Sequence, residues 1–174
     1  MPDQLSADLS ENLNRLFATQ QMHKAGIGNA PVIVKDALFR TDQIYWLDRK
    51  HNDAFENAFF DIMDAFIVHL NNTCYTGITS YEFHYTLYEK DSFYKKHLDQ
   101  FRNSDSRRFS MVFYLNADWK TGDGGELCVY HDDLVQIIEP LNGRMVFFKS
   151  NELPHEVLVT HKPRLSITGW LKKD

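Results

Sequence analysis

The chain has 174 residues, of which 43% are hydrophobic and 25% charged, a balance typical of one globular domain rather than a disordered or fibrous chain. Its net charge of −5 argues against nucleic acid as the main partner. The two cysteines lack C-x-x-C spacing, which excludes a disulfide framework or a thiolate zinc cluster and suits a reducing compartment. Since no apolar leader or membrane-length apolar run is present, we expect a cytoplasmic protein without a membrane partner.

The first part of the chain predicts two helices. Apolar residues recur at helical spacing over residues 7–24, with Ser6 or Asp8 as the N-cap. Residues 53–72 carry a broad apolar face and predict a second helix that ends near Asn71. A Gly- and Pro-containing stretch after the first helix breaks it.

From residue 78 the hydrophobic period changes from that of a helix to that of a strand. Seven β-rich runs follow, separated by turns: 78–88, 108–116, 125–131, 134–140, 144–150, 155–160 and 164–173. A short strand candidate also lies at 43–48. Strands of this number and spacing predict a barrel-like double sheet. The predicted fold is α+β in one domain over residues 1–174, with a helical part at about 7–72 packed on a β core at about 78–173.

Three His-x-Asp pairs are candidates for a metal site: His51 with Asp53, His97 with Asp99, and His131 with Asp133. About one such pair is expected by chance, so the spacing alone is weak. Side chains two positions apart share a face only in extended backbone. The first pair opens a predicted helix and the third ends a strand beside a polar turn, so both are expected to be solvated. His97 and Asp99 are therefore the best candidates.

A 2-His-1-carboxylate iron site needs a third ligand. The remaining histidines are His23 and His69 on predicted helices, His84 within a strand, His161 in a turn, and His155. His155 opens a strand directly after a proline, which would hold it rigidly. The residues by themselves do not decide among these five.

The last predicted strand carries a buried cation. Alternation places Arg164, Ser166, Thr168 and Trp170 on one face of this strand, and Leu165 and Ile167 on the other. An arginine on the inward face of a barrel is costly unless it meets an anion, and its planar fork suits a carboxylate. No acidic partner is evident in the sequence, so a ligand is a candidate for that anion.

These residues carry a family resemblance. His97-x-Asp99, His155 58 residues after His97, and Arg164 nine residues later resemble the Fe(II)- and 2-oxoglutarate-dependent dioxygenases. More narrowly, the pattern resembles the prolyl 4-hydroxylase branch, which includes the hypoxia-factor prolyl hydroxylases and their bacterial relatives. The resemblance covers roughly residues 38–173. Its segments are FRTDQIYWLD, LYEKDSFYKKHLDQF, FYLNADW, GGELCVY, GRMVFFKS, PHEV and RLSITGW.

The resemblance implies a double-stranded β-helix of the jelly-roll or cupin type, with Fe(II) bound by His97, Asp99 and His155. These three residues and Arg164 form the implied catalytic set. The cosubstrate 2-oxoglutarate would chelate the iron, with O₂ beside it, and its far carboxylate would meet Arg164. The further residues implied at the cosubstrate are Tyr114, Thr168 and Tyr88. Those implied at the substrate are Tyr94, Arg107 and Trp170. Ascorbate is an optional addition to this set of cofactors.

The implied reaction is hydroxylation of a prolyl residue in a protein, with succinate and CO₂ as co-products. Bacterial relatives in this branch modify a translation elongation factor, which favours a protein substrate. Alternatives are a hydroxylase of a small molecule or another side chain, and a cupin-like binding protein without turnover. An oxidative nucleic-acid demethylase is disfavoured, because that family has a second arginine where this chain has Trp170. Residues 24–42 match a mobile lid of the family, and a plain connection with an edge strand is the other interpretation.

Overall fold

The computed structural model describes residues 2–26, 36–100 and 103–174. Its helices are α1 (Asp3–Ala18), α2 (Ala54–Cys74) and the short 3-10 helix η1 (Arg49–His51). The strands are β1 (His23–Lys24), β2 (Gln43–Trp46), β3 (Ser80–Tyr88), β4 (Tyr94–His97), β5 (Arg107–Tyr114), β6 (Leu127–His131), β7 (Leu134–Ile138), β8 (Met145–Lys149), β9 (His155–Val157) and β10 (Arg164–Lys172).

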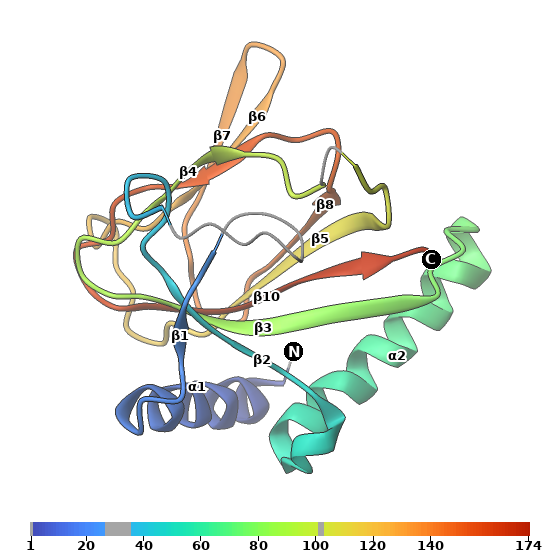
Figure 1. Cartoon of the computed structure of the whole chain (residues 1–174), viewed down its shortest axis with the longest axis horizontal. Coiled ribbons are helices and arrows are strands. Elements are labelled where there is room, and N and C mark those ends of the chain that lie inside the picture. Colours follow the sequence, from blue (N-terminus) through green and yellow to red (C-terminus); the bar gives the residue numbers. More distant parts are fainter. Residues whose placement is uncertain (1, 27–35, 101–102) are drawn as a thin grey trace.

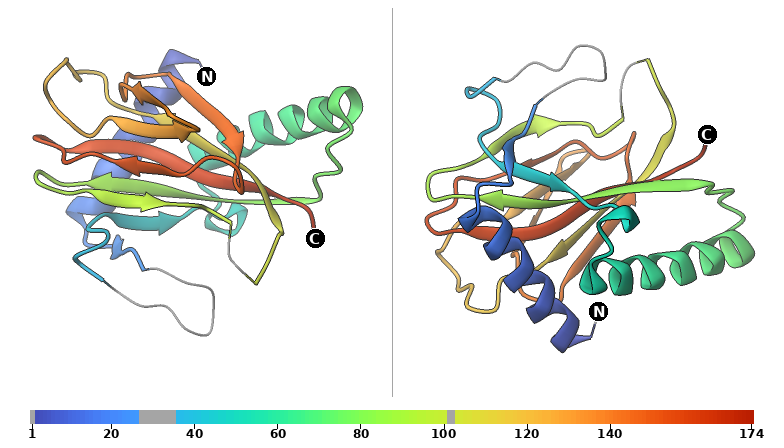
Figure 2. Two further views of the ribbon diagram at one scale, coloured as in Figure 1. Left: turned by 90° about the horizontal axis from the view of Figure 1, so that it is seen from above. Right: turned by 60° about the horizontal axis from the view of Figure 1, so that its bottom comes forward.

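The strands form two antiparallel sheets that face each other. The large sheet has the order β1-β2-β3-β10-β5-β8, and the small sheet has the order β4-β9-β6-β7. Both helices lie on one side of the large sheet, and the small sheet lies on the other side (Figures 1 and 2). This arrangement confirms the predicted α+β fold with helices packed on one sheet of a double-stranded β-helix. No helix in the described parts of the chain is long and apolar enough to cross a membrane.

The main core fills the layer between the helices and the large sheet. Leu9 and Leu13 of α1 are fully buried there, as is Phe59 of α2. The Phe59 ring meets Phe83 edge-on at 5.1 Å and Phe113 at 5.3 Å between centroids. Aromatic pairs in this geometry stabilise a core beyond the area they bury. The odd-numbered side chains of β3 therefore face the helices, which leaves the even-numbered ones for the space between the sheets.

The first helix begins four residues and ends six residues earlier than predicted. Pro2 precedes its first turn, so both N-cap candidates lie inside the helix, and Ser6 is buried against Asn142. The helix ends because Gln20 takes a left-handed φ of 57°, which no right-handed helix continues. His23 consequently lies in β1 and not on a helix, which corrects the prediction for that residue.

The second helix begins one residue later and ends two residues later than predicted. Asp53 is its N-cap, and its carboxylate accepts hydrogen bonds from the backbone N–H groups of Phe55 and Glu56. Asn71 does not end the helix. Its side chain instead bonds the backbone N–H and carbonyl of Ile78 and so ties the helix to the start of β3.

Each of the seven predicted β-rich runs overlaps one strand, and the 43–48 candidate contains β2. Strands β1 and β4 were not predicted. Residues 94–97 read YKKH, without alternation of apolar and polar residues, and are extended because they pair with β9. Of the predicted lid segment 24–42, residues 27–35 lie outside the described residues.

Candidate metal centre and cofactor pocket

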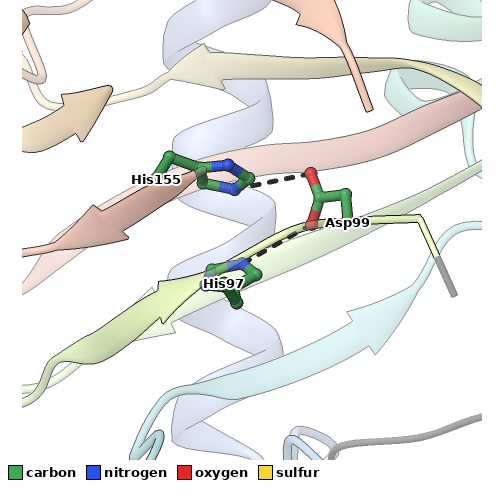
Figure 3. Close-up of side chains that lie close together, drawn as sticks. All are labelled: His97, Asp99 and His155. Carbon is green, nitrogen blue, oxygen red and sulfur yellow. Dashed lines mark ion pairs between the residues drawn. The ribbon is translucent and has the colours of Figure 1, made fainter. Parts of the chain in front are cut away.

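Strand pairing brings the two histidines of the predicted triad together. In the register of β4 against β9, His97 lies directly opposite His155. Asp99 follows in the bend after β4, and its carboxylate points between the two imidazole rings (Figure 3). The three ligand atoms lie within 4.8 Å of one another. The triad thus spans 58 residues of sequence through a single pair of strands.

Backbone carbonyl groups fix both imidazole rings. His97 Nδ1 lies 2.7 Å from the Lys95 carbonyl oxygen, and His155 Nδ1 lies 3.0 Å from that of Leu153. Each Nδ1 therefore carries the ring proton and donates a hydrogen bond to a carbonyl oxygen. The lone pair of each Nε2 is then free to bind a metal ion. Both Nε2 atoms lie 3.5 Å from an oxygen of Asp99. This orientation is the one that a metal ion between the three side chains requires.

The electrostatics of the site favour the metal-binding protonation states of Asp99 and His155. Burial on its own would raise the pKa of Asp99, but the imidazoles of His155 and His97 and a hydrogen bond from Ser110 hold that pKa well below its usual range. Burial lowers the pKa of His155, which keeps its imidazole neutral. A carboxylate with two neutral imidazoles is the donor set that Fe(II) takes in a facial triad with open positions. The residues present therefore fit Fe(II).

The triad lines a cavity of about 780 Å³ between the two sheets. Arg164 opens β10 and lies in the same cavity, where it is 2% exposed. Its Nε donates to the Gly125 carbonyl at 2.8 Å, and its Nη1 lies 3.4 Å from Ser166 Oγ. Among the described residues, no acidic side chain forms an ion pair with Arg164. A buried guanidinium in such a setting fits the carboxylate of a ligand.

Two tyrosines complete the surroundings of Arg164. Its guanidinium carbon lies 4.9 Å from the ring centroid of Tyr88 and 5.0 Å from that of Tyr114. The Tyr114 hydroxyl is buried and has no hydrogen-bond partner among the described residues. Burial raises the pKa of Tyr114, against the positive charge of Arg164, so its hydroxyl stays protonated. An unpaired buried donor beside an arginine is a second group that a carboxylate would satisfy.

Residues 83–172 match the family model of the 2OG-Fe(II) oxygenase superfamily. The chain belongs to this superfamily. It is also 33% identical to a prolyl-4-hydroxylase of Pseudomonas putida, covering 100% of this chain and 89% of that one with a TM-score of 0.89. This similarity places it on the prolyl hydroxylase branch. A prolyl hydroxylase from Trichoplax adhaerens has the same fold, with a TM-score of 0.87 and 23% identity over 99% of this chain and 80% of that one.

Curated relatives are similar over part of their length. The chain is 30% identical to the hypoxia-inducible factor prolyl hydroxylase of Caenorhabditis elegans over 147 residues, which is 79% of this chain and 20% of that protein. It is 37% identical to Egl nine homolog 1 of Rattus norvegicus over 81 residues, 44% of this chain. The match covers only 24% of the length of the rat protein.

The remaining predicted cosubstrate residues of this superfamily member divide into two groups. Tyr88 and Thr168 line the cavity with Arg164. Tyr114 is not among the lining residues, and its ring lies beside the guanidinium of Arg164. The face predicted for β10 is also observed: Leu165 and Ile167 belong to the core under the helices.

The three predicted substrate residues line the same cavity. Tyr94 stacks on His97, with ring centroids 3.6 Å apart. Arg107 was predicted in a polar loop, but it is the first residue of β5 and forms an ion pair with Glu82 at 2.7 Å. Its guanidinium carbon lies 3.4 Å from the ring centroid of Trp170. Because β5 pairs with β10, Arg107 belongs to a strand rather than to a loop, and its side chain lies against this ring.

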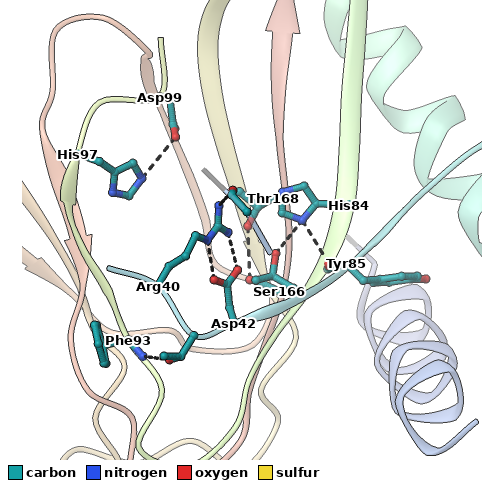
Figure 4. A network of polar contacts seen from close by, with 12 residues as sticks. Arg40, Asp42, His84, Tyr85, Phe93, His97, Asp99, Ser166 and Thr168 are labelled. Atoms are coloured by element: carbon teal, nitrogen blue, oxygen red, sulfur yellow. Dashed lines mark hydrogen bonds and ion pairs between the residues drawn. The ribbon is translucent and has the colours of Figure 1, made fainter. Parts of the chain in front are cut away.

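The cavity also contains residues to which the sequence alone assigned no role. Arg40 makes a bidentate ion pair with the buried Asp42, at 2.8 and 2.6 Å (Figure 4). Its guanidinium carbon lies 4.1 Å from the Tyr94 ring centroid. Trp46 and His84 also line the cavity. Arg40, Asp42 and Trp46 lie in the segment FRTDQIYWLD, which carries part of the family resemblance, so the sequence did contain a signal for these three residues. His84 carried no such signal.

The other two His-x-Asp pairs lie away from the cavity. His51 Nδ1 contacts Glu56 at 2.9 Å, while Asp53 caps α2. His131 and Asp133 lie at the exposed turn between β6 and β7. Among the described residues, His97, Asp99 and His155 form the only cluster whose ligand atoms could share one metal ion.

Proposed function

We propose that this chain is an Fe(II)- and 2-oxoglutarate-dependent dioxygenase that hydroxylates a prolyl residue of a protein, with succinate and CO₂ as co-products. One observation carries the proposal: an iron-type triad shares a cavity with the buried guanidinium of Arg164, which has no acidic partner among the described residues. The similarity to prolyl hydroxylases supports the choice of reaction.

One group of side chains in the cavity would bind the iron, and a second group would bind the far end of the cosubstrate. When bound, Fe(II) and 2-oxoglutarate supply the oxidative chemistry with O₂. His97 and His155 would hold the ion through Nε2, and Asp99 through its carboxylate. Arg164 and the Tyr114 hydroxyl would bind the far carboxylate of the cosubstrate and so set its distance from the ion. A charge-assisted pair in this buried position gives both affinity and orientation.

Apolar side chains of the cavity keep water from the reacting groups. Val112, Leu127 and Val157 are among the side chains that line it. Two of them, Leu127 and Val157, are buried on the small sheet in one cluster with Tyr88. A dry wall strengthens the electrostatic contacts inside the site and limits side reactions with water.

The substrate end of the cavity fits part of a polypeptide. The exposed Trp46 and the buried Trp170 lie 6.4 Å apart between ring centroids, and Arg107 packs on the second of them. The Trichoplax structure holds a peptide fragment of hypoxia inducible factor, which supports a protein substrate here. Cytoplasmic location and use of ascorbate as an optional reductant are part of the proposal.

The test is whether the iron-loaded protein converts 2-oxoglutarate to succinate, with His97→Ala as the inactive variant. His131→Ala is the matched control, because His131 lies at an exposed turn. We expect His97→Ala to abolish turnover and the control to retain it. Mass spectrometry of candidate proteins would then locate an added oxygen atom on proline. Fe(II) binding without turnover under any substrate would contradict the proposal, and oxygen added only to a free amino acid would replace its protein substrate.

A further inference from the structure

The half-buried ring of Tyr94 covers one face of the His97 imidazole. The two centroids are 3.6 Å apart, and the ring planes are inclined by only 15°. The other histidine of the triad has no stacked partner among the described residues: Phe148 meets His155 edge-on, at 4.9 Å and 70°. The contact between Tyr94 and His97 therefore belongs to one ligand and is not a general feature of the site.

A guanidinium covers the opposite face of Tyr94. The guanidinium carbon of Arg40 lies 4.1 Å from the Tyr94 centroid. Because the imidazole already occupies one face at stacking distance, a group this close to the centroid lies against the other face. Asp42, which is buried, holds the guanidinium there through two hydrogen bonds (Figure 4). The result is a layered stack of guanidinium, phenol and imidazole.

The guanidinium of Arg40 is fully occupied by these contacts and one more. Its Nε and Nη2 donate to Asp42, and its Nη1 donates to the Gly26 carbonyl oxygen at 3.1 Å. A cation paired in this way does not need an anionic ligand, in contrast to Arg164. The position of Arg40 in the cavity thus calls for a role other than binding the cosubstrate.

The backbone brings the three layers together through an irregularity in β4. Tyr94 and His97 are three positions apart, and in a regular strand their side chains would point to opposite faces. The register of β4 against β9 shifts between them, so that both rings lie on the same side. On the free edge of β4, Arg40 forms an isolated antiparallel bridge with Tyr94, and the Lys95 N–H donates to the Phe39 carbonyl at 2.9 Å.

The plane of an imidazole decides where its metal-binding electron pair points, because the Nε2 lone pair lies in that plane. The hydrogen bond from His97 Nδ1 to the Lys95 carbonyl oxygen fixes one edge of the ring. It leaves the ring free to tilt about that contact. A flat partner at 3.6 Å restrains the tilt, so the hydrogen bond and the stack together determine the direction of the lone pair.

We propose that Tyr94 and Arg40 are positioning residues of the metal centre, whose stack fixes the plane of the His97 imidazole and so directs its Nε2 lone pair at the ion. The inference rests on the metal site of the proposed function, and it gives Tyr94 a role beyond contact with the substrate. The guanidinium is attracted to the face of the phenol ring, and its ion pair with Asp42 keeps the outer layer in place.

Three substitutions separate the flat ring from its bulk and from the charge behind it. Tyr94→Leu keeps an apolar side chain without a flat face, and we expect it to weaken Fe(II) binding about tenfold. Tyr94→Phe keeps the ring and should restore the affinity to within about twofold. Arg40→Lys keeps a positive charge beside Asp42 but lacks the planar group, and should weaken Fe(II) binding about threefold.

Tyr130→Leu is the matched control. Tyr130 belongs to β6 of the same small sheet and also carries a cation on its face, since Lys96 Nζ lies 3.6 Å from its centroid. Among the described residues its ring contacts no member of the triad. Its loss should leave the Fe(II) affinity unchanged, although it removes the same side chain from the same sheet.

The measurement is an anaerobic titration of the apo-protein with Fe(II), without cosubstrate or peptide, followed by one with Co(II). The visible absorption of Co(II) depends on the arrangement of its ligands. We expect an altered Co(II) spectrum in Tyr94→Leu and a normal one in Tyr94→Phe and Tyr130→Leu. A Tyr94→Leu variant with normal Kd and normal spectrum, or equal losses in Tyr94→Leu and Tyr130→Leu, would overturn the proposal. If Tyr94→Leu does not fold, Arg40→Lys decides by the same two criteria.

The titration also distinguishes this inference from the proposed function. If the protein binds Fe(II) with the expected order of variants but hydroxylates no prolyl peptide, the substrate is wrong and the stack keeps its role. If the unsubstituted protein binds neither Fe(II) nor Co(II), the triad is no metal site and the positioning role is overturned with it. A raised KM for a prolyl peptide in Tyr94→Leu, with metal affinity unchanged, would make Tyr94 a substrate contact alone.

Discussion

Ser110 Oγ lies 2.6 Å from Asp99 Oδ2 and donates a hydrogen bond to the carboxylate oxygen that faces His155. Ser110 belongs to β5 of the large sheet, whereas His97 and His155 belong to the small sheet. The carboxylate is therefore oriented from one sheet and the imidazoles from the other. The geometry of the triad depends on how the two sheets are held together.

Removing the Ser110 hydroxyl should loosen the carboxylate without removing a ligand. Groups that hydrogen-bond a metal ligand typically change metal affinity by about 10- to 100-fold. We expect Ser110→Ala to weaken Fe(II) binding by about tenfold, measured by anaerobic titration of the apo-protein. Ser150→Ala is the matched control, because Ser150 bonds Ser110 at 2.9 Å but does not touch Asp99. Equal losses in the two variants would show that the serine pair acts on stability alone.

Arg164 should destabilise the protein when no ligand is bound. It is buried, and among the described residues it has no acidic partner, so its charge is compensated only by dipoles. Replacing it with an apolar side chain of similar length removes an unpaired buried charge. We expect Arg164→Met to unfold at the same temperature as the unsubstituted protein or higher, and to lose the increase in Tm that 2-oxoglutarate produces.

The same substitution should raise the 2-oxoglutarate requirement by about 100-fold or more, because one partner of a buried charge pair is missing. Tyr114→Phe removes only a hydroxyl and should raise the requirement about tenfold. Thermal unfolding with and without 2-oxoglutarate measures both variants. A ligand-dependent increase in Tm that survives in Arg164→Met would remove Arg164 from the cosubstrate site.

The sequence predicted the fold well where the signal was local. Alternating apolar residues and turn residues marked the seven β-rich runs, and the helical period marked α1 and α2. The strand β4 gave no such signal, since it has two consecutive lysines and is extended through its pairing with β9. The end of α1 was misplaced because it depends on the backbone angle of Gln20 rather than on an apolar pattern.

Residue spacing was less informative about the site than about the fold. His97 and His155 meet through the register of two strands, which no local pattern encodes, so only the family resemblance paired them. The hydrogen bond of Ser110 with Asp99 joins β5 to the bend after β4, and the hydrophobic periodicity of the sequence does not indicate such a contact. That the three residues bind iron stays a prediction, which the Fe(II) titration tests directly.

Gly125 should control the position of Arg164. It has a φ of +76°, and a Cβ built on it would lie 2.9 Å from Arg164 Cδ and 3.1 Å from Thr160 Cβ. Gly143 has a similar φ of +74° but nothing within 4 Å of such a Cβ. Both alanine variants should lose about 1 kcal/mol of stability from the left-handed backbone. Only Gly125→Ala should also raise the KM for the cosubstrate, because it displaces the guanidinium.

Urea unfolding and steady-state kinetics on the two glycine variants separate these effects. Gly143→Ala supplies the loss due to the backbone alone, so any further change in Gly125→Ala belongs to the contact with Arg164. A cosubstrate KM that is the same in both variants would mean that Arg164 moves aside without loss of function.

The buried His84 should make the stability of the fold depend on pH. Burial and the charges of Arg40 and Arg107 lower its pKa to about 4, whereas an imidazole of the unfolded chain titrates near 6.5. As the pH falls below 6.5, the unfolded chain takes up the proton first. The contribution of a neutral His84 to the free energy of unfolding is therefore complete above about pH 6.5 and is lost as the pH falls towards 4.

A pKa depression of this size corresponds to about 3 kcal/mol. Other groups titrate in the same range, so the measured quantity is the difference in the free energy of unfolding between the unsubstituted protein and His84→Gln. Glutamine does not titrate, and the difference should shift by about 3 kcal/mol in favour of the variant between neutral pH and about pH 4. Urea unfolding at several pH values measures it. A difference that stays constant over this range would mean that the folded protein admits a charged imidazole at position 84, and that the cavity around it is wetter than its burial indicates.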